Sequence, residues 1–387
     1  MMIRLALPFL AALCLSIAAC SDSSDRSSPG PDPIPLTEPA EVADDFGPWA
    51  VGHQRLEAID VVRGNRVLPY DVWYPVDEAD ALPEPRTVYP LAAGLGLTAE
   101  RAVEDLPVSV AGGLSLLIFS HGYGGTNTQS VLLMETLASH GFVVVSPEHT
   151  GNTNDDASDP REVAGANRVP DVSFFIDAFL GRNNTPGDDF YQRLDPASIG
   201  VLGHSFGGGT ALGSVAGYFG QPRDPRVIAA LPISVEVIDS FSDEALAAVD
   251  EPVLFLGGTL DTAVPIENHD YGFDRLTAST AVFQVDIVNA AHTHFANICA
   301  IANLLIDNGI GPDLWPAIGA AALIPPYEES CAEGAFPIEE AHRIQNLYAV
   351  AFFRRYLRGE TAYDFYLQPG YAAENEPDVS YRARVSD

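Results

Sequence analysis

Short runs of hydrophobic residues alternate with longer stretches of helical periodicity from about residue 55 onward. Strands are predicted at 67–75, 114–120, 142–147, 198–204, 226–234, 252–258 and 281–288. Helices are predicted at 128–140, 171–180, the small-residue stretch after Ser205, and 339–357. Strands that are hydrophobic throughout are buried on both faces. The pattern therefore predicts an α/β domain with a mostly parallel central sheet and helices on both faces.

The first twenty residues, MMIRLALPFLAALCLSIAAC, follow a different pattern. Arg4 precedes an apolar run that is too short to span a bilayer comfortably, and small residues precede Cys20, as in a processing site. The stretch SIAAC resembles the lipobox of bacterial lipoproteins. That resemblance implies a signal peptide over residues 1–19, a lipid anchor on Cys20 and an exported, membrane-anchored protein. An ordinary cleaved signal and a secreted protein are the alternative.

Residues 20–47 are rich in Ser, Asp and Pro, so we expect a flexible tether there and a single domain over residues 48–387. An apolar insert, residues 299–331, follows the last predicted strand. Because an exported domain meets an oxidising compartment, Cys299 and Cys331 are expected to form a disulfide that closes this insert. The insert is then either a wall or lid of an acyl pocket or an additional packed helical hairpin.

The chain of 387 residues carries 53 acidic and 20 basic side chains, and every basic one is Arg. A net charge of −33 repels nucleic acid, which excludes nucleic-acid binding. The sequence has no HExxH, CxxC, complete EF-hand, P-loop or dinucleotide motif, so we expect neither a metal nor a cofactor. The polar stretch 152–160, NTNDDASDP, is interpreted as a solvated loop rather than a calcium site.

The stretch SIGVLGHSFGGGTAL, residues 198–212, places Ser205 between glycines where a strand gives way to a helix. The pattern G-x-S-x-G at such a junction is typical of a nucleophile elbow, a strained turn that exposes the serine oxygen and needs small neighbours. Ser205 is therefore the candidate nucleophile. His204, inside this motif, is interpreted as structural.

A serine nucleophile needs a base, and the base needs an acid to orient it. Asp261 comes just after the strand 252–258, and His292 and His294 come just after the strand 281–288, which is the chain order expected for this kind of site. We predict Asp261 as the acid and His294 as the base, with His292 as the alternative.

The reaction also needs donors for the developing oxyanion. One is expected to be the backbone N–H of Phe206, the residue after the nucleophile. The other is expected from the glycine-rich stretch FSHGYGGTN, through the N–H of Tyr123. His121 in this stretch is interpreted as structural.

The stretch LLIFSHGYGGTNTQSVLLMETLASHGFVVVSPEHTGN, together with GHSFGGGTAL, resembles the plasma-type platelet-activating-factor acetylhydrolases and bacterial predicted dienelactone hydrolases. GGTLDTAVP and THFAN resemble polyester hydrolases of the cutinase type. These resemblances imply the α/β-hydrolase fold. Pro232 lies near the place where the acetylhydrolases carry their acid, which favours Asp261 over Glu236 or Asp239. The serine at position 205 does not support dienelactone chemistry, because true dienelactone hydrolases use a cysteine.

The expected function is hydrolysis of short-chain carboxylic esters through an acyl-enzyme on Ser205. Acetylated or oxidised phospholipids and aliphatic polyesters are the alternative substrates. A tethered binding lipoprotein that has lost catalysis is the alternative of another class, and the presence of candidate Ser, Asp and His residues argues against it.

Overall fold

The computed structural model describes residues 39, 41–91 and 94–386. The predicted signal peptide, residues 1–19, and the candidate anchor Cys20 lie outside the described residues. Within the described part of the chain, no helix has both the length and the apolar character needed to span a membrane.

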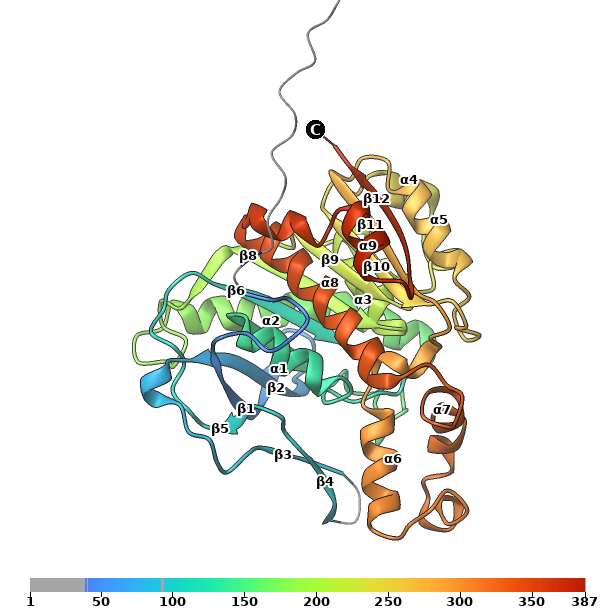
Figure 1. The fold of residues 1–387 in the computed structure, drawn as a ribbon. Helices are drawn as coiled ribbons and strands as arrows, with labels where there is room; N and C mark the ends of the chain where they lie inside the picture. Colours follow the sequence, from blue (N-terminus) through green and yellow to red (C-terminus); the bar gives the residue numbers. More distant parts are fainter. Residues whose placement is uncertain (1–38, 40, 92–93, 387) are drawn as a thin grey trace, which may run out of the picture. The chain divides into compact units, whose positions relative to one another are not determined.

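A ten-stranded sheet runs through the body, in the order β12-β11-β10-β9-β8-β6-β7-β2-β1-β5 (Figure 1). Its strands are β1 (Ala50–Asp60), β2 (Arg66–Val76), β5 (Val103–Glu104), β6 (Leu114–Ser120), β7 (Phe142–Pro147), β8 (Leu194–His204), β9 (Ala229–Ile233), β10 (Val253–Gly258), β11 (Ala281–Ile287) and β12 (Val379–Val385). The consecutive neighbours from β7 to β11 pair in parallel, whereas β2 pairs with β7 and β12 pairs with β11 antiparallel. A separate two-stranded ribbon joins β3 (Val88–Pro90) to β4 (Gly96–Thr98). The predicted, mostly parallel sheet is confirmed.

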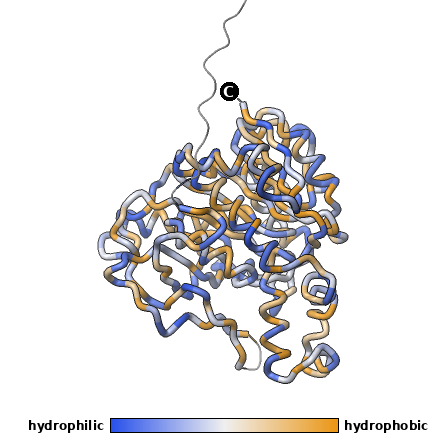
Figure 2. The backbone as a smooth tube through the Cα atoms, viewed as in Figure 1, coloured by the Kyte–Doolittle hydropathy of each residue, from blue (hydrophilic) through white to orange (hydrophobic). Residues whose placement is uncertain are grey.

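Helices cover both faces of the sheet. The hydrophobic core on one face contains side chains of α1 (Val131–Ser139) and α8 (Ile338–Arg358). The core on the other face contains side chains of α2 (Arg161–Asn183), α3 (Phe206–Ala216), α4 (Asp243–Ala247) and α5 (Glu267–Arg275). In β6, Leu117 faces the first core and Ile118 the second, so alternate side chains of a continuously apolar strand are buried on opposite faces. Hydrophobic residues accordingly run through the middle of the body (Figure 2).

The edges of the sheet were not expected from the sequence. The predicted strands 114–120 and 142–147 coincide with β6 and β7, whereas β1, β12 and the small helix α9 (Pro369–Asn375) had no counterpart in the hydrophobic pattern. β12 is half-exposed along most of its length and carries two arginines, so it lacks the apolar run that identifies a buried strand. Helix α2 begins at Arg161, ten residues before the predicted start at 171. Its first ten residues include Gly165 and Pro170, which disfavour a helix and hide its start from the sequence pattern.

Residues 41–47, expected to be the end of the tether, pack against the domain. Ala43 is fully buried. Glu41 pairs with Arg354 at 2.9 Å, and Asp44 pairs with Arg343 at 3.1 Å. These contacts correct the expected tether boundary at residue 47: the ordered domain already includes residue 41, because acidic side chains of this segment meet arginines of α8.

The insert after β11 forms α6 (Ile298–Asp307) and α7 (Ile324–Ser330), which lie side by side at one end of the body (Figure 1). Its own core is small, built on Ala302, Leu305 and Trp315. Cys299 and Cys331 form the predicted disulfide, with a Cα–Cα distance of 5.4 Å. Closing a loop of this length removes about 3–4 kcal/mol of unfolded-state entropy in the chain-entropy description, which offsets the small core of the insert.

Candidate active site

Ser205 occupies a strained turn between β8 and α3. Its backbone has φ 58° and ψ −120°, a conformation that L-residues rarely adopt. The turn depends on glycine: a Cβ on Gly207 would lie 1.8 Å from the carbonyl oxygen of Ser120, and one on Gly203 would lie 2.4 Å from the carbonyl oxygen of Gly207. The serine is half-buried and has the tightly turned geometry predicted from the G-x-S-x-G pattern.

Asp261 and His292 form a hydrogen-bonded pair in the loops that follow β10 and β11. The His292 Nδ1 lies 2.7 Å from the Asp261 Oδ2. The other carboxylate oxygen of Asp261 accepts hydrogen bonds from the backbone N–H groups of Ala263, at 3.0 Å, and Val264, at 2.7 Å. Burial alone would raise the pKa of Asp261, but the hydrogen bonds from His292 and the backbone hold the pKa below its ordinary value. Asp261 is therefore ionised at neutral pH. Among the described residues, the Nε2 of His292 has no hydrogen-bond partner.

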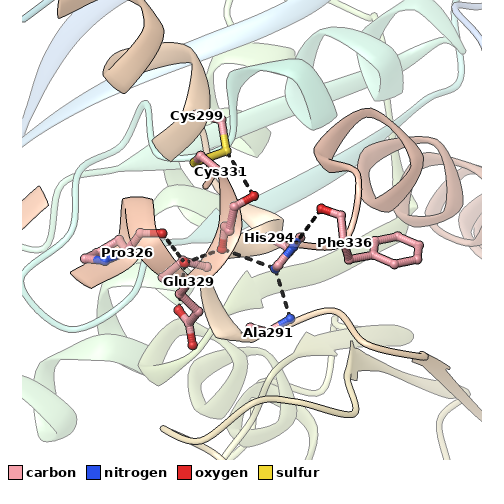
Figure 3. Close-up of a disulfide and its surroundings, with 9 residues drawn as sticks. Ala291, His294, Cys299, Pro326, Glu329, Cys331 and Phe336 are labelled. Carbon is pink, nitrogen blue, oxygen red and sulfur yellow. Dashed lines mark hydrogen bonds between the residues drawn. A yellow bond between two sulfur atoms is a disulfide. The ribbon is translucent and has the colours of Figure 1, made fainter. Parts of the chain in front are cut away.

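The structure pairs Asp261 with His292 rather than with His294, which contradicts the expected Asp261–His294 pair. His294 is fully buried, and both of its ring nitrogens are occupied (Figure 3). Nδ1 accepts from the backbone N–H of Ala291 at 2.9 Å and from the Ser330 hydroxyl at 3.1 Å, and Nε2 lies 3.2 Å from the Phe336 carbonyl. Burial lowers the pKa of His294, consistent with a neutral imidazole that ties the strand end to the disulfide-closed insert.

The two residues expected to supply oxyanion donors, Tyr123 and Phe206, contact each other. Phe206 is the first residue of α3, so its N–H has no acceptor within the helix. The rings of Tyr123 and Phe206 meet edge to face with centroids 5.4 Å apart. A Cβ on Gly122 would lie 3.6 Å from the Ser205 Cβ, which places the glycine-rich loop directly over the nucleophile. The loop and the helix start therefore meet beside the nucleophile, where an oxyanion would form.

Ser205 and His292 line one cavity of about 420 Å³. Apolar side chains from the β3–β4 ribbon and from α6 form part of its wall: Leu91, Leu97, Ile298 and Ile301. A second, wider groove passes the outer side of His292, between the loop carrying Asp261 and α7. The nucleophile candidate and the Asp261-bound histidine therefore face a common space large enough for a small ester.

A family model described as PETase, PET hydrolase-like, matches residues 105–306, more than half of the chain. The chain belongs to the PET hydrolase-like family. The matched segment contains Ser205, Asp261, His292 and both expected oxyanion donors. The predicted resemblance to α/β-hydrolases with polyester-hydrolase features is thereby confirmed.

Two curated relatives of this family member are 27% and 30% identical to it over a little under half of its length. "Cutinase est1" of Thermobifida alba is 30% identical over 46% of this chain and 53% of its own length. "Bis(hydroxyethyl) terephthalate hydrolase" of Streptomyces coelicolor is 27% identical over 48% of this chain and 53% of its own length. The chain thus spans about half the length of the curated relatives it matches.

A solved structure supports the fold over a longer stretch than the sequence relatives do. The ferulic acid esterase from Streptomyces cinnamoneus superposes with a TM-score of 0.60 at 23% identity, covering 89% of this chain and 98% of the esterase. Together with the parallel sheet and its helices, this confirms the expected α/β-hydrolase fold.

In this PET hydrolase-like chain, a polar relay connects the three loops of the site. Gln129 accepts from the Gly122 N–H at 2.9 Å and donates to the His204 Nδ1 at 2.9 Å. The His204 Nε2 in turn donates to the His292 carbonyl oxygen at 2.8 Å. Burial and the neighbouring His292 lower the pKa of His204 to about 3, which keeps it neutral, as this pattern of donors and acceptors requires. His204 is thus structural, as interpreted from the sequence.

Sequence reasoning missed Gln129, because it stands in no recognisable motif. The alternative acids do not reach the site: Glu236 pairs with Arg161, and Asp239 is exposed. Among the described residues, no group of three or more His, Cys, Asp or Glu side chains is arranged to hold a metal ion.

The buried histidines of this family member predict how stability depends on pH. Burial lowers the pKa of His140, His149 and His342 to about 4, that of His204 to about 3, and that of His121 well below its ordinary value. Unfolded histidines bind a proton near pH 6.5, so the unfolded chain takes up more protons than the folded chain as the pH falls from about 6.5 to 4. We expect the urea midpoint to fall from pH 7.5 to pH 5 and to change little between pH 7.5 and 8.5.

Protonation of surface carboxylates relieves repulsion among the many acidic side chains and acts in the opposite direction. Repeating the titration in 0.5 M NaCl, used here as a screening salt, separates the two effects. A urea midpoint at pH 5 equal to or above that at pH 7.5 in high salt would contradict the neutral state of these histidines.

Proposed function

We propose that this chain is a serine carboxylic-ester hydrolase in which Ser205 is the nucleophile, His292 the base and Asp261 the orienting acid. The observation that carries the proposal is the 2.7 Å contact between His292 and Asp261, beside a cavity that Ser205 also lines. Membership of the PET hydrolase-like family supports it, as do the printed names of the relatives: cutinase, bis(hydroxyethyl) terephthalate hydrolase and ferulic acid esterase.

In the first half of the reaction, the Ser205 Oγ attacks the ester carbonyl carbon and its proton passes to the His292 Nε2. The carbonyl π electrons move to oxygen, and the backbone N–H groups of Tyr123 and Phe206 donate to that oxyanion. When the carbonyl re-forms, the carbon–oxygen bond to the alcohol breaks and His292 gives the alcohol its proton. An acyl group remains on Ser205.

In the second half, water replaces the alcohol. The water oxygen attacks the acyl carbon while His292 takes a proton from the water. Collapse of the second oxyanion breaks the bond to the Ser205 Oγ, which recovers the proton from His292, and the carboxylic acid leaves. Throughout both halves Asp261, kept ionised by its hydrogen bonds, holds the His292 Nδ1–H and stabilises the imidazolium that forms twice.

The substrate class that the cavity favours is a small ester with an apolar group of a few carbons. A volume of about 420 Å³ and walls from Leu91, Leu97, Ile298 and Ile301 suit such a group. Polyesters and acetylated or oxidised phospholipids are the alternatives, and the wider groove beyond His292 favours the polyester among them, because it extends the site past one ester unit.

The test is hydrolysis of p-nitrophenyl acetate, butyrate and octanoate by the full chain, with a fluorophosphonate probe to label an activated serine. We expect turnover of acetate and butyrate above that of octanoate, and one label, on Ser205. A folded chain that hydrolyses none of the three esters and takes up no probe would replace the proposal with a non-catalytic binding role.

We further propose that the protein is exported and anchored through a lipid on Cys20. The support is the sequence of residues 1–20, in which a basic residue, an apolar run and small residues precede the cysteine. Partition of the expressed protein into a detergent phase, compared with that of Cys20→Ser, tests the anchor. Equal partition of the two would count against it.

A further inference from the structure

Arg168 of α2 is a fully buried arginine beneath the loop that carries the expected oxyanion donor. Its Nη1 donates to the Ser120 hydroxyl at 3.0 Å and to the His121 carbonyl at 2.5 Å. Its Nη2 donates to the Gly122 carbonyl at 3.2 Å and to the Asn152 side-chain oxygen at 2.5 Å. One guanidinium therefore holds two consecutive carbonyls of the glycine-rich loop.

The second of these carbonyls belongs to the peptide group that matters for catalysis. The Gly122 C=O and the Tyr123 N–H are opposite ends of one planar unit, so fixing the oxygen fixes the direction of the N–H. Besides Arg168, the Gly122 oxygen lies 2.7 Å from the His121 Nδ1 and accepts from the Gly125 N–H at 3.1 Å. Hydrogen bonds to a carbonyl oxygen also polarise the amide and strengthen its N–H as a donor.

The charge of Arg168 is not cancelled by an ion pair. All four acceptors of its hydrogen bonds are neutral, and within the part of the chain that the structure describes no carboxylate lies within 4.0 Å of its guanidinium nitrogens. The nearby Asp171 is engaged by Arg66 at 2.9 Å and by His149 at 2.8 Å. Burial lowers the pKa of Arg168 to about 9, with Asp171 acting in the opposite direction, so the side chain is a cation at neutral pH.

We propose that Arg168 is a positioning residue of the oxyanion hole: it aims the Tyr123 N–H through the Gly122 carbonyl and places a buried positive charge beneath the developing oxyanion. This inference rests on the proposed serine-hydrolase function. Preorganised donors and charges in a site of low dielectric stabilise the transition state more than the ground state. The effect of Arg168 therefore belongs in kcat rather than in KM.

The experiment compares Arg168→Met and Arg168→Lys with a matched control, Arg354→Met, in the full chain. Arg354 is also a buried arginine, 7% exposed, and donates to a backbone carbonyl, that of His140 at 3.0 Å, but it lies on α8 across the sheet. Each variant is assayed well below its melting temperature for kcat and KM with p-nitrophenyl acetate. Each is also assayed for inhibition by phenylboronic acid, which forms a tetrahedral anion on an activated serine.

For Arg168→Met we expect kcat to fall about 100-fold with KM changed less than about threefold, because one donor of an oxyanion hole is worth roughly that factor. The boronic acid inhibition constant should rise in parallel. Arg168→Lys keeps the positive charge but cannot donate to both carbonyl groups of the loop in the same geometry. We expect its kcat to fall about tenfold. Arg354→Met should lower the melting temperature and leave kcat unchanged.

A kcat for Arg168→Met within threefold of the unmodified chain overturns the proposal. If Arg168→Met does not fold, Arg168→Lys decides: unchanged kcat and unchanged boronic acid inhibition overturn the proposal in the same way. A loss of kcat of equal size in Arg354→Met would assign the effect to general destabilisation and would also overturn it. Ser205→Ala tests the proposed serine-hydrolase function separately from the role of Arg168. Full activity in that variant would show that Ser205 is not the nucleophile.

Discussion

Replacing His292 with alanine is expected to lower kcat for p-nitrophenyl acetate by about 10⁵- to 10⁶-fold, the size of loss seen when the base of a serine triad is removed. The reason is the geometry of the pair: Nδ1 lies 2.7 Å from Asp261, which leaves Nε2 to take the serine proton. Measurement of kcat and KM on the purified variant, with the melting temperature as a check of folding, decides the prediction.

His294→Ala is the matched control two residues away. It removes a buried imidazole that accepts from Ala291 and Ser330 and contacts the Phe336 carbonyl, and each buried group left without a partner costs about 1–3 kcal/mol. We therefore expect a lower melting temperature but a kcat within about tenfold of the unmodified chain. An inactive His294→Ala beside an active His292→Ala would show that the pair with Asp261 is not the working one.

Ser205→Ala is expected to lose activity by about 10⁶-fold and to lose all labelling by the fluorophosphonate probe. The alanine keeps nearly the same volume but cannot supply the oxygen that forms the acyl-enzyme. It should also be about as stable as the unmodified chain, because alanine keeps the same strained backbone of φ 58° and the hydroxyl that it lacks serves chemistry rather than packing.

Ser214→Ala provides the comparison on the same helix. Ser214 is fully buried, and its hydroxyl donates to the Thr210 carbonyl at 2.8 Å within α3. Loss of that hydrogen bond should affect stability by about 1 kcal/mol and leave kcat unchanged. If Ser205→Ala retains turnover comparable to that of Ser214→Ala, the nucleophile lies elsewhere.

The disulfide-closed insert, residues 299–331, separates what the sequence predicts from what depends on tertiary contacts. The sequence predicted the Cys299–Cys331 pair from the export signal and the cysteine count. It left open whether the insert covers a pocket or forms an extra hairpin. In the structure, α6 contributes Ile298 and Ile301 to the cavity wall, and Ser330 of α7 forms a hydrogen bond to the buried His294.

The hydrophobic pattern alone was sufficient to predict the central strands of the sheet. The G-x-S-x-G junction was sufficient to predict the position of the candidate nucleophile. Both are local properties: a strand buried on both faces is apolar throughout, and a strained turn needs glycine beside it. The edge strands β1 and β12 escaped prediction because a half-exposed strand carries polar residues that a pattern cannot distinguish from a loop.

Only the tertiary structure shows which of His292 and His294 contacts Asp261. The two side chains are separated by a single residue, and the short 3₁₀ turn His292–Phe295 directs one toward Asp261 and the other into the core against Phe336. The proposed role of Arg168 could not be predicted for the same reason. It depends on hydrogen bonds to carbonyl groups of a loop that lies 46 residues earlier in the chain. Sequence alone determined which residue types are present at the sheet edge. Which of them meet is set by backbone direction and by contacts between segments far apart in the chain, and only the folded chain specifies those.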